Sequence, residues 1–253
     1  ELYLGKYKVV EQKAPENLVI GKTEQERTQF VTLSYAGQNV ELSQGETTFT
    51  NARPEISVNV VKKSKHDDVT LEGATFGLYA EEDLTAADGK VLVEKGSLVE
   101  RAVSDREGMA VFHADIPLNF HYSVKEIQAP EGYLLDQTEY EVECTYEGGT
   151  VPTIERTVKA TDTVMKQPFQ IIKAANNGET DAELLKGAGF SAYLKSSLQK
   201  KEDGSYDFSK AEPVVITADG KTEMFTDEKG YACSIPLPYG TYIVRETTTP
   251  HNY

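Results

Sequence analysis

The feature that most constrains this chain is a short pattern of three residues that occurs three times. In every copy a tyrosine stands four residues before a glutamate, and a proline stands four residues after it. The copies are Tyr7, Glu11 and Pro15; Tyr122, Glu126 and Pro130; and Tyr242, Glu246 and Pro250. The glutamates are 115 and 120 residues apart, which is too long for a solenoid repeat and typical of separate domains. The sequence therefore predicts similar domains in tandem.

A second pattern supports the same organisation. The run Leu71-x-Gly73-Ala74-x-Phe76 returns 114 residues later as Leu185-x-Gly187-Ala188-x-Phe190. We therefore expect three segments. The first segment, residues 1–53, is the C-terminal part of one repeat. The middle segment, residues 54–165, is a complete repeat, and the third segment, residues 166–253, is the N-terminal part of another.

The hydrophobic periodicity is that of β-strands. Ile56, Val58 and Val60 alternate with polar residues, as in a strand with one buried face. Turn signals such as Asp88-Gly89 and Gly148-Gly149 separate short runs of this kind, and no stretch shows sustained helical periodicity. We predict an all-β fold of tandem antiparallel, immunoglobulin-like β-sandwiches.

Composition excludes several functions. The formal net charge of −15 argues against nucleic-acid binding, because no basic patch balances the acidic residues. No run of 18 apolar residues is present, so no membrane span is predicted in this chain. Cys144 and Cys233 fall in different repeats, and neither they nor the histidines have metal-ligand spacing. We expect no metal and no cofactor.

The glutamate of the repeated pattern is out of place on its strand. Glu126 lies on the same predicted strand face as Tyr122 and Val124, which is otherwise apolar. A lone carboxylate buried there is unfavourable unless it is protonated or has a partner. The threefold recurrence of this position indicates that it has a role.

A lysine near the start of a repeat and an Asn or Asp at the end of the preceding one also recur at matching positions. Lys62 continues the phase of Val58 and Val60, and Lys173 occupies the same place in the third segment. Asn51 and Asp162 each stand 11 residues before one of these lysines, at the end of the preceding repeat. A complete repeat would therefore bring together a lysine from its first strand, a glutamate, and an Asn or Asp from its last strand. In the middle segment these are Lys62, Glu126 and Asp162.

Three such groups in an apolar core can react with one another. Burial disfavours charge, which favours a neutral, nucleophilic amine and a protonated glutamate. The glutamate can polarise the carbonyl of the acceptor and carry protons, while the fold holds the amine against the carbonyl carbon. The predicted product is an amide between the Lys62 and Asp162 side chains, formed with loss of water and without an added catalyst.

Plainer interpretations exist for each residue. Lys62 lies in the run Lys62-Lys63-Ser64-Lys65 and could be a surface lysine, and Lys63 takes its place if a β-bulge shifts the register. Glu126 could be a solvated charge on an edge strand, and Asp162 a residue of a linker.

The sequence resembles the Cna B-type, SpaA-like domains of Gram-positive surface adhesins and pilins. The stretch Glu126-x-x-Ala129-Pro130-x-Gly132-Tyr133 carries the resemblance, together with Lys62, the run from Leu71 to Phe76, and Asp162. The resemblance implies a prealbumin-like β-sandwich, display on the cell wall outside the cell, and a role as stalk, pilin or adhesin. It also implies an isopeptide triad. The terminal segments each hold two of its members, Glu11 with Asn51 and Lys173 with Glu246.

Three functions follow as hypotheses. The first is a structural stalk or adhesin module that cross-links itself and contacts the neighbouring domains of its own chain. The second is a module that binds a host matrix protein or glycan, with the insertion at residues 195–212, including Tyr206 and Phe208, as the candidate surface. An enzyme that acts on an external substrate is not expected, because no nucleophile–base arrangement or phosphate-binding loop is present.

Overall fold

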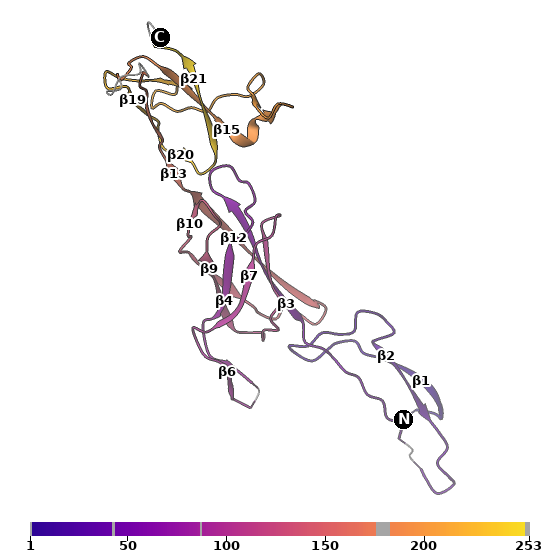
Figure 1. Ribbon diagram of the computed structural model, residues 1–253. Helices are drawn as coiled ribbons and strands as arrows, with labels where there is room; N and C mark the ends of the chain where they lie inside the picture. The colour runs from indigo at the N-terminus through magenta and orange to yellow at the C-terminus, as the bar shows by residue number, and fades with distance from the viewer. Residues whose placement is uncertain (1, 42–43, 87, 176–182, 251–253) are drawn as a thin grey trace. The chain divides into compact units, whose positions relative to one another are not determined.

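In a computed structural model of the chain, residues 2–41, 44–86, 88–175 and 183–250 are described, and their regular secondary structure is almost wholly β-strand (Figure 1). The one helical element among them is a single 3₁₀ turn, η1 (Lys195–Ser197). No helix in the described ranges is both long enough and apolar enough to cross a membrane. The predicted all-β fold class is therefore confirmed.

The chain divides into two compact units. One consists of Glu1–Pro130 with Leu135–Asp162, and the other of Glu131–Leu134 with Thr163–Tyr253. Residues 1–53 fall in the first of these, so the division expected at residue 53 stays a prediction. This segment contains an antiparallel hairpin of β1 (Gly5–Val10) and β2 (Thr28–Leu33).

The middle segment folds as two sheets packed face to face. Its strands are β3 (Glu55–Ser64), β4 (Thr75–Ala80), β5 (Leu84–Thr85), β6 (Val91–Val93), β7 (Leu98–Val103), β8 (Met109–Phe112), β9 (His121–Gln128), β10 (Tyr133–Leu134), β11 (Glu139–Glu143) and β12 (Thr153–Val164). One sheet has the order β10-β12-β3-β8 and the other β11-β9-β4-β7, while β5 and β6 pair with each other in a separate two-stranded sheet. Inward-facing residues of both sheets form one apolar core, with Val60, Phe76 and Leu78 fully buried.

The first and last strands of this sandwich are paired in parallel. Glu55 lies opposite Thr153, and Lys62 lies opposite Ala160, whereas the other pairings of the two sheets are antiparallel. Parallel neighbours need a long crossover connection. Here the intervening strands of the sandwich supply it. The consequence is that the C-terminal ends of β3 and β12 lie side by side.

The third segment is also built from short β-strands, and their lengths differ from those in the middle segment. Its strands are β13 (Lys166–Gln167), β14 (Gln170–Ile172), β15 (Gly189–Leu194), β16 (Gln199–Lys200), β17 (Tyr206–Asp207), β18 (Glu223–Phe225), β19 (Tyr231–Cys233), β20 (Leu237–Pro238) and β21 (Tyr242–Thr248). The central sheet is β18-β15-β21, and the buried core includes Ala188, Phe190 and Ile216. This segment also leaves large apolar side chains in solvent, notably Ile172 and Tyr239.

Residues 131–134 pack within the second compact unit, and Gly132 is essential to that packing. Its φ of +86° lies in the left-handed region. A Cβ at this position would stand 2.1 Å from Cδ1 of Tyr239, so no larger residue fits without a shift.

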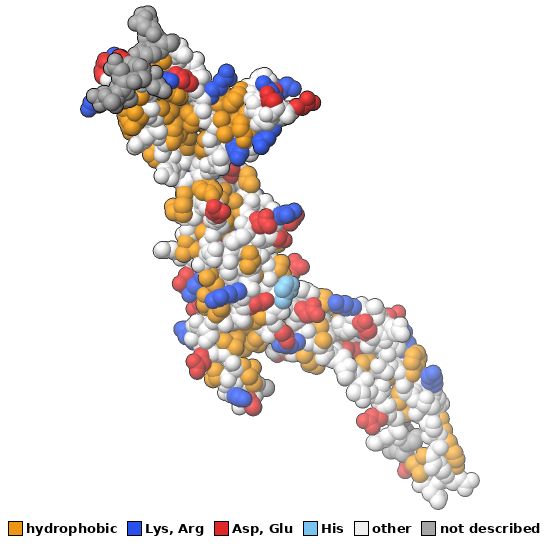
Figure 2. Space-filling model, viewed as in Figure 1, with side chains coloured by type: hydrophobic (Ala, Val, Ile, Leu, Met, Phe, Trp, Pro, Cys, Tyr) orange, Lys and Arg blue, Asp and Glu red, His pale blue; other side chains and the backbone are white. Residues whose placement is uncertain are grey.

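Charged side chains are scattered over the face shown in Figure 2. On the face shown in Figure 2, basic side chains lie among acidic ones rather than in one continuous patch. This distribution accords with the acidic composition of the chain.

Candidate functional site

Lys62 owes its position to the alternation of β3. Val58, Val60, Lys62 and Ser64 all point to the core, because successive residues of a strand face opposite sides. The backbone of Lys62 forms hydrogen bonds with residues outside β3 and β12. Its N–H donates to Gly108 O at 2.7 Å, and its carbonyl accepts from Leu71 N at 3.1 Å. The lysine side chain is fully buried.

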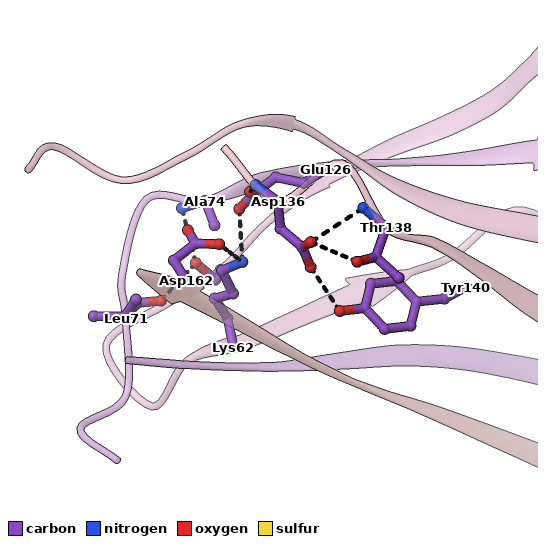
Figure 3. Close-up of polar contacts among 9 residues, drawn as sticks. Lys62, Leu71, Ala74, Glu126, Asp136, Thr138, Tyr140 and Asp162 are labelled. Atoms are coloured by element: carbon purple, nitrogen blue, oxygen red, sulfur yellow. Dashed lines mark hydrogen bonds and ion pairs between the residues drawn. The ribbon is translucent and has the colours of Figure 1, made fainter. Parts of the chain in front are cut away.

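Three strands bring the predicted reactive groups together. Glu126 comes from β9, where it lies opposite Phe76 of β4, and Asp162 comes from the end of β12. Lys62 Nζ lies 2.9 Å from Glu126 Oε1 and donates a hydrogen bond to Asp162 Oδ1 (Figure 3). All three side chains have no solvent exposure. The trio predicted from phase and spacing is thus assembled in the core.

Apolar groups lie beside the trio. The ring of Phe76, a residue of the sandwich core, lies 5.3 Å from Lys62 Nζ. Interactions between charges are much stronger in such an environment than in water, and so is the penalty for an unpaired charge.

The electrostatics shift Asp162 toward its protonated form. Burial raises the pKa of Asp162 to about 6, although the hydrogen bond and the charge of Lys62 oppose the rise. The neighbouring carboxyl group of Glu126 raises the pKa of Asp162 further. Two carboxyl groups beside one amine cannot both be ionised without strong repulsion.

Two buried oxygens of the trio receive no hydrogen bond from the described residues. They are Glu126 Oε1 and Asp162 Oδ2. Buried polar atoms are rarely left without a partner. A proton held between the two carboxyl groups would satisfy both atoms at once.

The other oxygen of Glu126 has a donor that sequence reasoning missed. Asp136 N–H donates to Glu126 Oε2 at 2.8 Å, and the Asp136 carboxylate accepts from Thr138 and from Tyr140. The pattern Asp136-x-Thr138 was a visible signal, because an Asp that bonds the backbone two residues later is a common turn. Its proximity to Glu126 was not visible in the sequence.

The structure places Lys63 away from the core. Its side chain is 36% exposed and makes an ion pair with Asp68 at 2.7 Å. Strand β3 has no bulge beside β12 that would exchange the two lysines. Among the two candidates, Lys62 is therefore the one next to Glu126 and Asp162.

The partial sets in the terminal segments are also brought together. In the first segment, Asn51 Nδ2 donates to Glu11 Oε2 at 3.0 Å. In the third, Lys173 Nζ donates to Glu246 Oε2 at 2.7 Å, with the two side chains 27% and 32% exposed. The backbone around Lys173 repeats that around Lys62: its N–H donates to Gly230 O, and its carbonyl accepts from Leu185 N.

Phe208, one of the two aromatic residues of the insertion in the third segment, packs against the strands beside it. Phe208 makes an edge-to-face contact with Tyr193 at 4.9 Å between ring centroids, and the Arg245 guanidinium lies 5.0 Å from the Phe208 ring centroid. These contacts attach residues 195–212 to β15 and β21.

No metal-binding group of His, Cys, Asp and Glu side chains occurs in the described ranges. Both cysteines are free thiols, Cys144 buried and Cys233 exposed. Burial raises the pKa of the Cys144 thiol to about 11, as expected for an unreactive structural cysteine.

Comparison with known proteins gives a family match. The model for the SpaA prealbumin-like fold domain matches residues 56–158 and 168–253. No match was found among curated proteins.

The comparison with solved structures also finds matches. The Bacillus anthracis TIE protein is 21% identical with a TM-score of 0.53, over 98% of this chain and 37% of that protein. A streptococcal ancillary pilin is 16% identical with a TM-score of 0.35, over 100% of this chain and 69% of that one. The shaft pilin SpaA from Lactobacillus rhamnosus GG is 15% identical with a TM-score of 0.32, over 79% of this chain and 89% of that one. This chain thus spans about a third of the length of the TIE protein, and that likeness concerns the fold alone.

Proposed function

Because the chain belongs to the SpaA prealbumin-like fold family, we propose that it is a structural segment of a bacterial surface protein, displayed outside the cell on the wall. In this proposal the middle segment closes itself with an isopeptide bond between Lys62 and Asp162, and Glu126 assists. The chain acts on itself and on no external substrate. The observation that carries the proposal is the fully buried contact of the Lys62 amine with both carboxyl groups.

The proposed reaction begins with a proton transfer. The Lys62 ammonium gives a proton to the Glu126 carboxylate, whose Oε1 lies 2.9 Å from Nζ. Glu126 then holds this proton against Asp162 Oδ2 and polarises the carbonyl. Asp162 itself has a pKa of about 6, so it is mainly protonated at pH values below 6.

Bond formation follows by addition and elimination. The lone pair of Lys62 Nζ forms a bond to the Cγ of Asp162, and the C=O electron pair moves to Oδ2, which accepts the proton of Glu126. Glu126 takes a proton from the nitrogen and passes it to the hydroxyl Oδ1. The C–Oδ1 bond breaks, water leaves, Oδ2 returns its proton to Glu126, and an amide remains. Holding the reacting atoms together supplies an effective molarity on the order of 10⁵ M or more, which makes an otherwise slow condensation feasible.

The proposed bond has a mechanical and a thermodynamic purpose. Lys62 and Asp162 are 100 residues apart in sequence, so the bond closes a large loop. By the chain-entropy model used for disulfides, closing a loop of this size stabilises the fold by about 4–5 kcal/mol. An amide, unlike a disulfide, is not broken by reducing agents. The closed loop suits a protein exposed to shear and proteases.

Intact-mass measurement of the folded chain tests the proposal. We expect the wild-type protein to be lighter than its sequence mass by one water, and a protease digest to contain a branched peptide that joins Lys62 to Asp162. Glu126→Ala should keep the full mass. A folded wild-type protein that keeps its full mass after long incubation would overturn the proposal.

The alternative role, binding of a host matrix protein or glycan, has no specific observation in its favour. Both aromatic residues of the insertion have contacts within the chain. Phe208 contacts Tyr193 and Arg245, and the Lys200 amine lies 6.0 Å from the centroid of the Tyr206 ring. Screening the chain against matrix proteins and glycans tests this alternative independently of the cross-link.

A further inference from the structure

We propose that Asp136 is a positioning residue for the cross-link: its side chain shapes a turn that fixes one oxygen of Glu126 and leaves the other to carry the proton. The inference rests on the proposed function, since it concerns the same reaction. It assigns a role to a residue outside the Lys–Glu–Asp trio.

The turn lies at the end of the connection that leads from β9, the strand of Glu126, through β10 to β11. Strand β11 pairs with β9, with Tyr140 opposite Val124. Asp136 lies just before β11, and its N–H therefore reaches Glu126 Oε2, at 2.8 Å. Figure 3 shows Asp136 next to Glu126, with Thr138 and Tyr140 on its far side.

The Asp136 carboxylate uses both of its oxygens to hold this turn. Oδ1 accepts from Thr138 N at 3.1 Å and from Thr138 Oγ1 at 2.6 Å. Oδ2 accepts from Tyr140 OH at 2.6 Å. Tyr140 is partly buried against the sandwich core, so the turn is attached to a rigid strand.

This arrangement decides which oxygen of Glu126 can hold a proton. A backbone N–H can only donate, so an oxygen that accepts from it is unfavourable for protonation. Oε2 is occupied in this way by Asp136 N–H. A proton on Glu126 is therefore directed to Oε1, which accepts from no backbone N–H and lies 2.9 Å from its ion-pair partner, Lys62 Nζ.

The charge state of the turn residues agrees with this assignment. Burial opposes ionisation of Asp136, but hydrogen bonds from Thr138 and Tyr140 and the charge of Lys62 outweigh it and lower the pKa of Asp136. Burial and the nearby Asp136 raise the pKa of Tyr140, so its hydroxyl keeps the proton that it donates.

The experiment measures the rate of water loss on refolding of the full chain. Unlinked chain is isolated in denaturant and diluted into buffer, and samples are stopped by return to denaturant for intact-mass analysis, while circular dichroism follows folding. Asp136→Ala removes both acceptors, and we expect linking roughly ten- to a hundredfold slower, the scale for misplacing a catalytic group. The folding rate should change little.

Asp136→Asn separates shape from charge. Its amide oxygen can still accept from Thr138, and its NH₂ group can donate to the Tyr140 oxygen. We expect this conservative variant to recover most of the rate lost in Asp136→Ala. A general loss of stability would not be reversed selectively in this way.

Asp203→Ala is the matched control. Asp203 Oδ1 accepts from Ser205 N at 2.9 Å and from Ser205 Oγ at 2.7 Å, which is the same kind of turn in the third segment. This variant should link at the wild-type rate.

Each outcome is decisive. A wild-type linking rate in Asp136→Ala, or an Asp136→Asn variant as slow as Asp136→Ala, would overturn the assignment. If Asp136→Ala does not refold, Tyr140→Phe replaces it: this removes only the O–H donor, should slow linking severalfold, and at an unchanged rate would contradict the inference. Wild-type protein that never loses water would instead refute the proposed function itself.

Discussion

Lys62, Glu126 and Asp162 are three ionisable groups in a space without solvent exposure. Burying such groups is unfavourable, and a buried ion pair is weak evidence for stability by itself. The same arrangement is useful if it leads to a covalent bond, because the product amide carries no charge. The residue-level predictions therefore concern the reaction rather than the stability of the ion pair.

The first prediction concerns pH. The acid form of Asp162 is the electrophile, since a carboxylate carbon resists attack. With a pKa of about 6 for Asp162, the acid form dominates at pH 5 and is the minor form at pH 8. We therefore expect the linking rate in refolding experiments to fall as pH rises through about 6. A rate that increases across this range would mean that loss of a proton from the amine controls the reaction.

The second prediction concerns the leaving group. Asp162→Asn keeps the shape of the acceptor and would release ammonia in place of water. The linked product is then the same molecule as linked wild type, so the two masses should coincide although the unlinked masses differ. Asp162→Ala, which has no carbonyl to attack, should keep its full mass. A fully unlinked but folded Asp162→Asn variant would contradict the proposed mechanism.

At the level of elements, the pairing of β3 with β12 places the reacting groups. Because the pair is parallel, Lys62 and Asp162 lie at neighbouring C-terminal ends, with Lys62 opposite Ala160 and Asp162 opposite Ser64. The turn before β8 holds β3 from its other edge, through Lys62 N and Gly108 O. The geometry of the site thus depends on one turn glycine as well as on the strands.

The third prediction concerns that glycine. Gly108 has a φ of +75°, and a Cβ there would lie 2.5 Å from the carbonyl oxygen of Lys62. Gly108→Ala should lower the free energy of unfolding by about 1–3 kcal/mol, the usual range for a strained backbone position. Thermal unfolding is best measured in an Asp162→Ala background, so that the cross-link does not mask the loss.

Gly89→Ala is the control for this substitution. Gly89 has a similar φ of +82°, but no atom lies within 4 Å of the added Cβ. It should destabilise the protein less than Gly108→Ala and leave linking unchanged. Equal effects of the two variants would show that only backbone strain, and not the contact with β3, matters.

At the level of the molecule, the proposed bond changes how the middle segment carries force. Tension that enters at Glu55 and leaves at Val164 would pull the parallel strands β3 and β12 in opposite directions. A bond from Lys62 to Asp162 would pass this force directly between the two strands. The residues between them would not be extended.

The fourth prediction is therefore mechanical. In single-molecule stretching, the middle segment of Asp162→Ala should lengthen on unfolding by about 35 nm more than that of the linked wild type, from about 100 residues at roughly 3.5 Å each. A disulfide reductant should change neither trace. Equal extension of linked wild type and variant would exclude the proposed force path.

The fifth prediction concerns equilibrium stability. Linked wild type should unfold in urea with a free energy about 4–5 kcal/mol above that of Glu126→Ala, because the loop closed by the bond restricts the unfolded chain. The unfolding slope with denaturant should also be smaller for the linked protein, since its unfolded state is more compact. Identical curves would remove the stabilising role proposed for the bond.

The amino-acid sequence was enough to predict the β-rich repeats and to single out Glu126, Asp162 and a lysine at position 62 or 63 as candidates for one buried site. Strand periodicity, turn residues and the phase of Lys62 with Val58 and Val60 are local properties, and repetition along the chain made each of them visible more than once. The family resemblance rested on the same local motifs.

Three features became visible in the folded chain alone: the parallel pairing of β3 with β12, the choice of Lys62 over Lys63, and the contact of Asp136 with Glu126. Each of these depends on which strands become neighbours after a long crossover. A local pattern shows which face a side chain takes, but it does not show which distant backbone N–H will meet it. That is settled when the two sheets close over a common core.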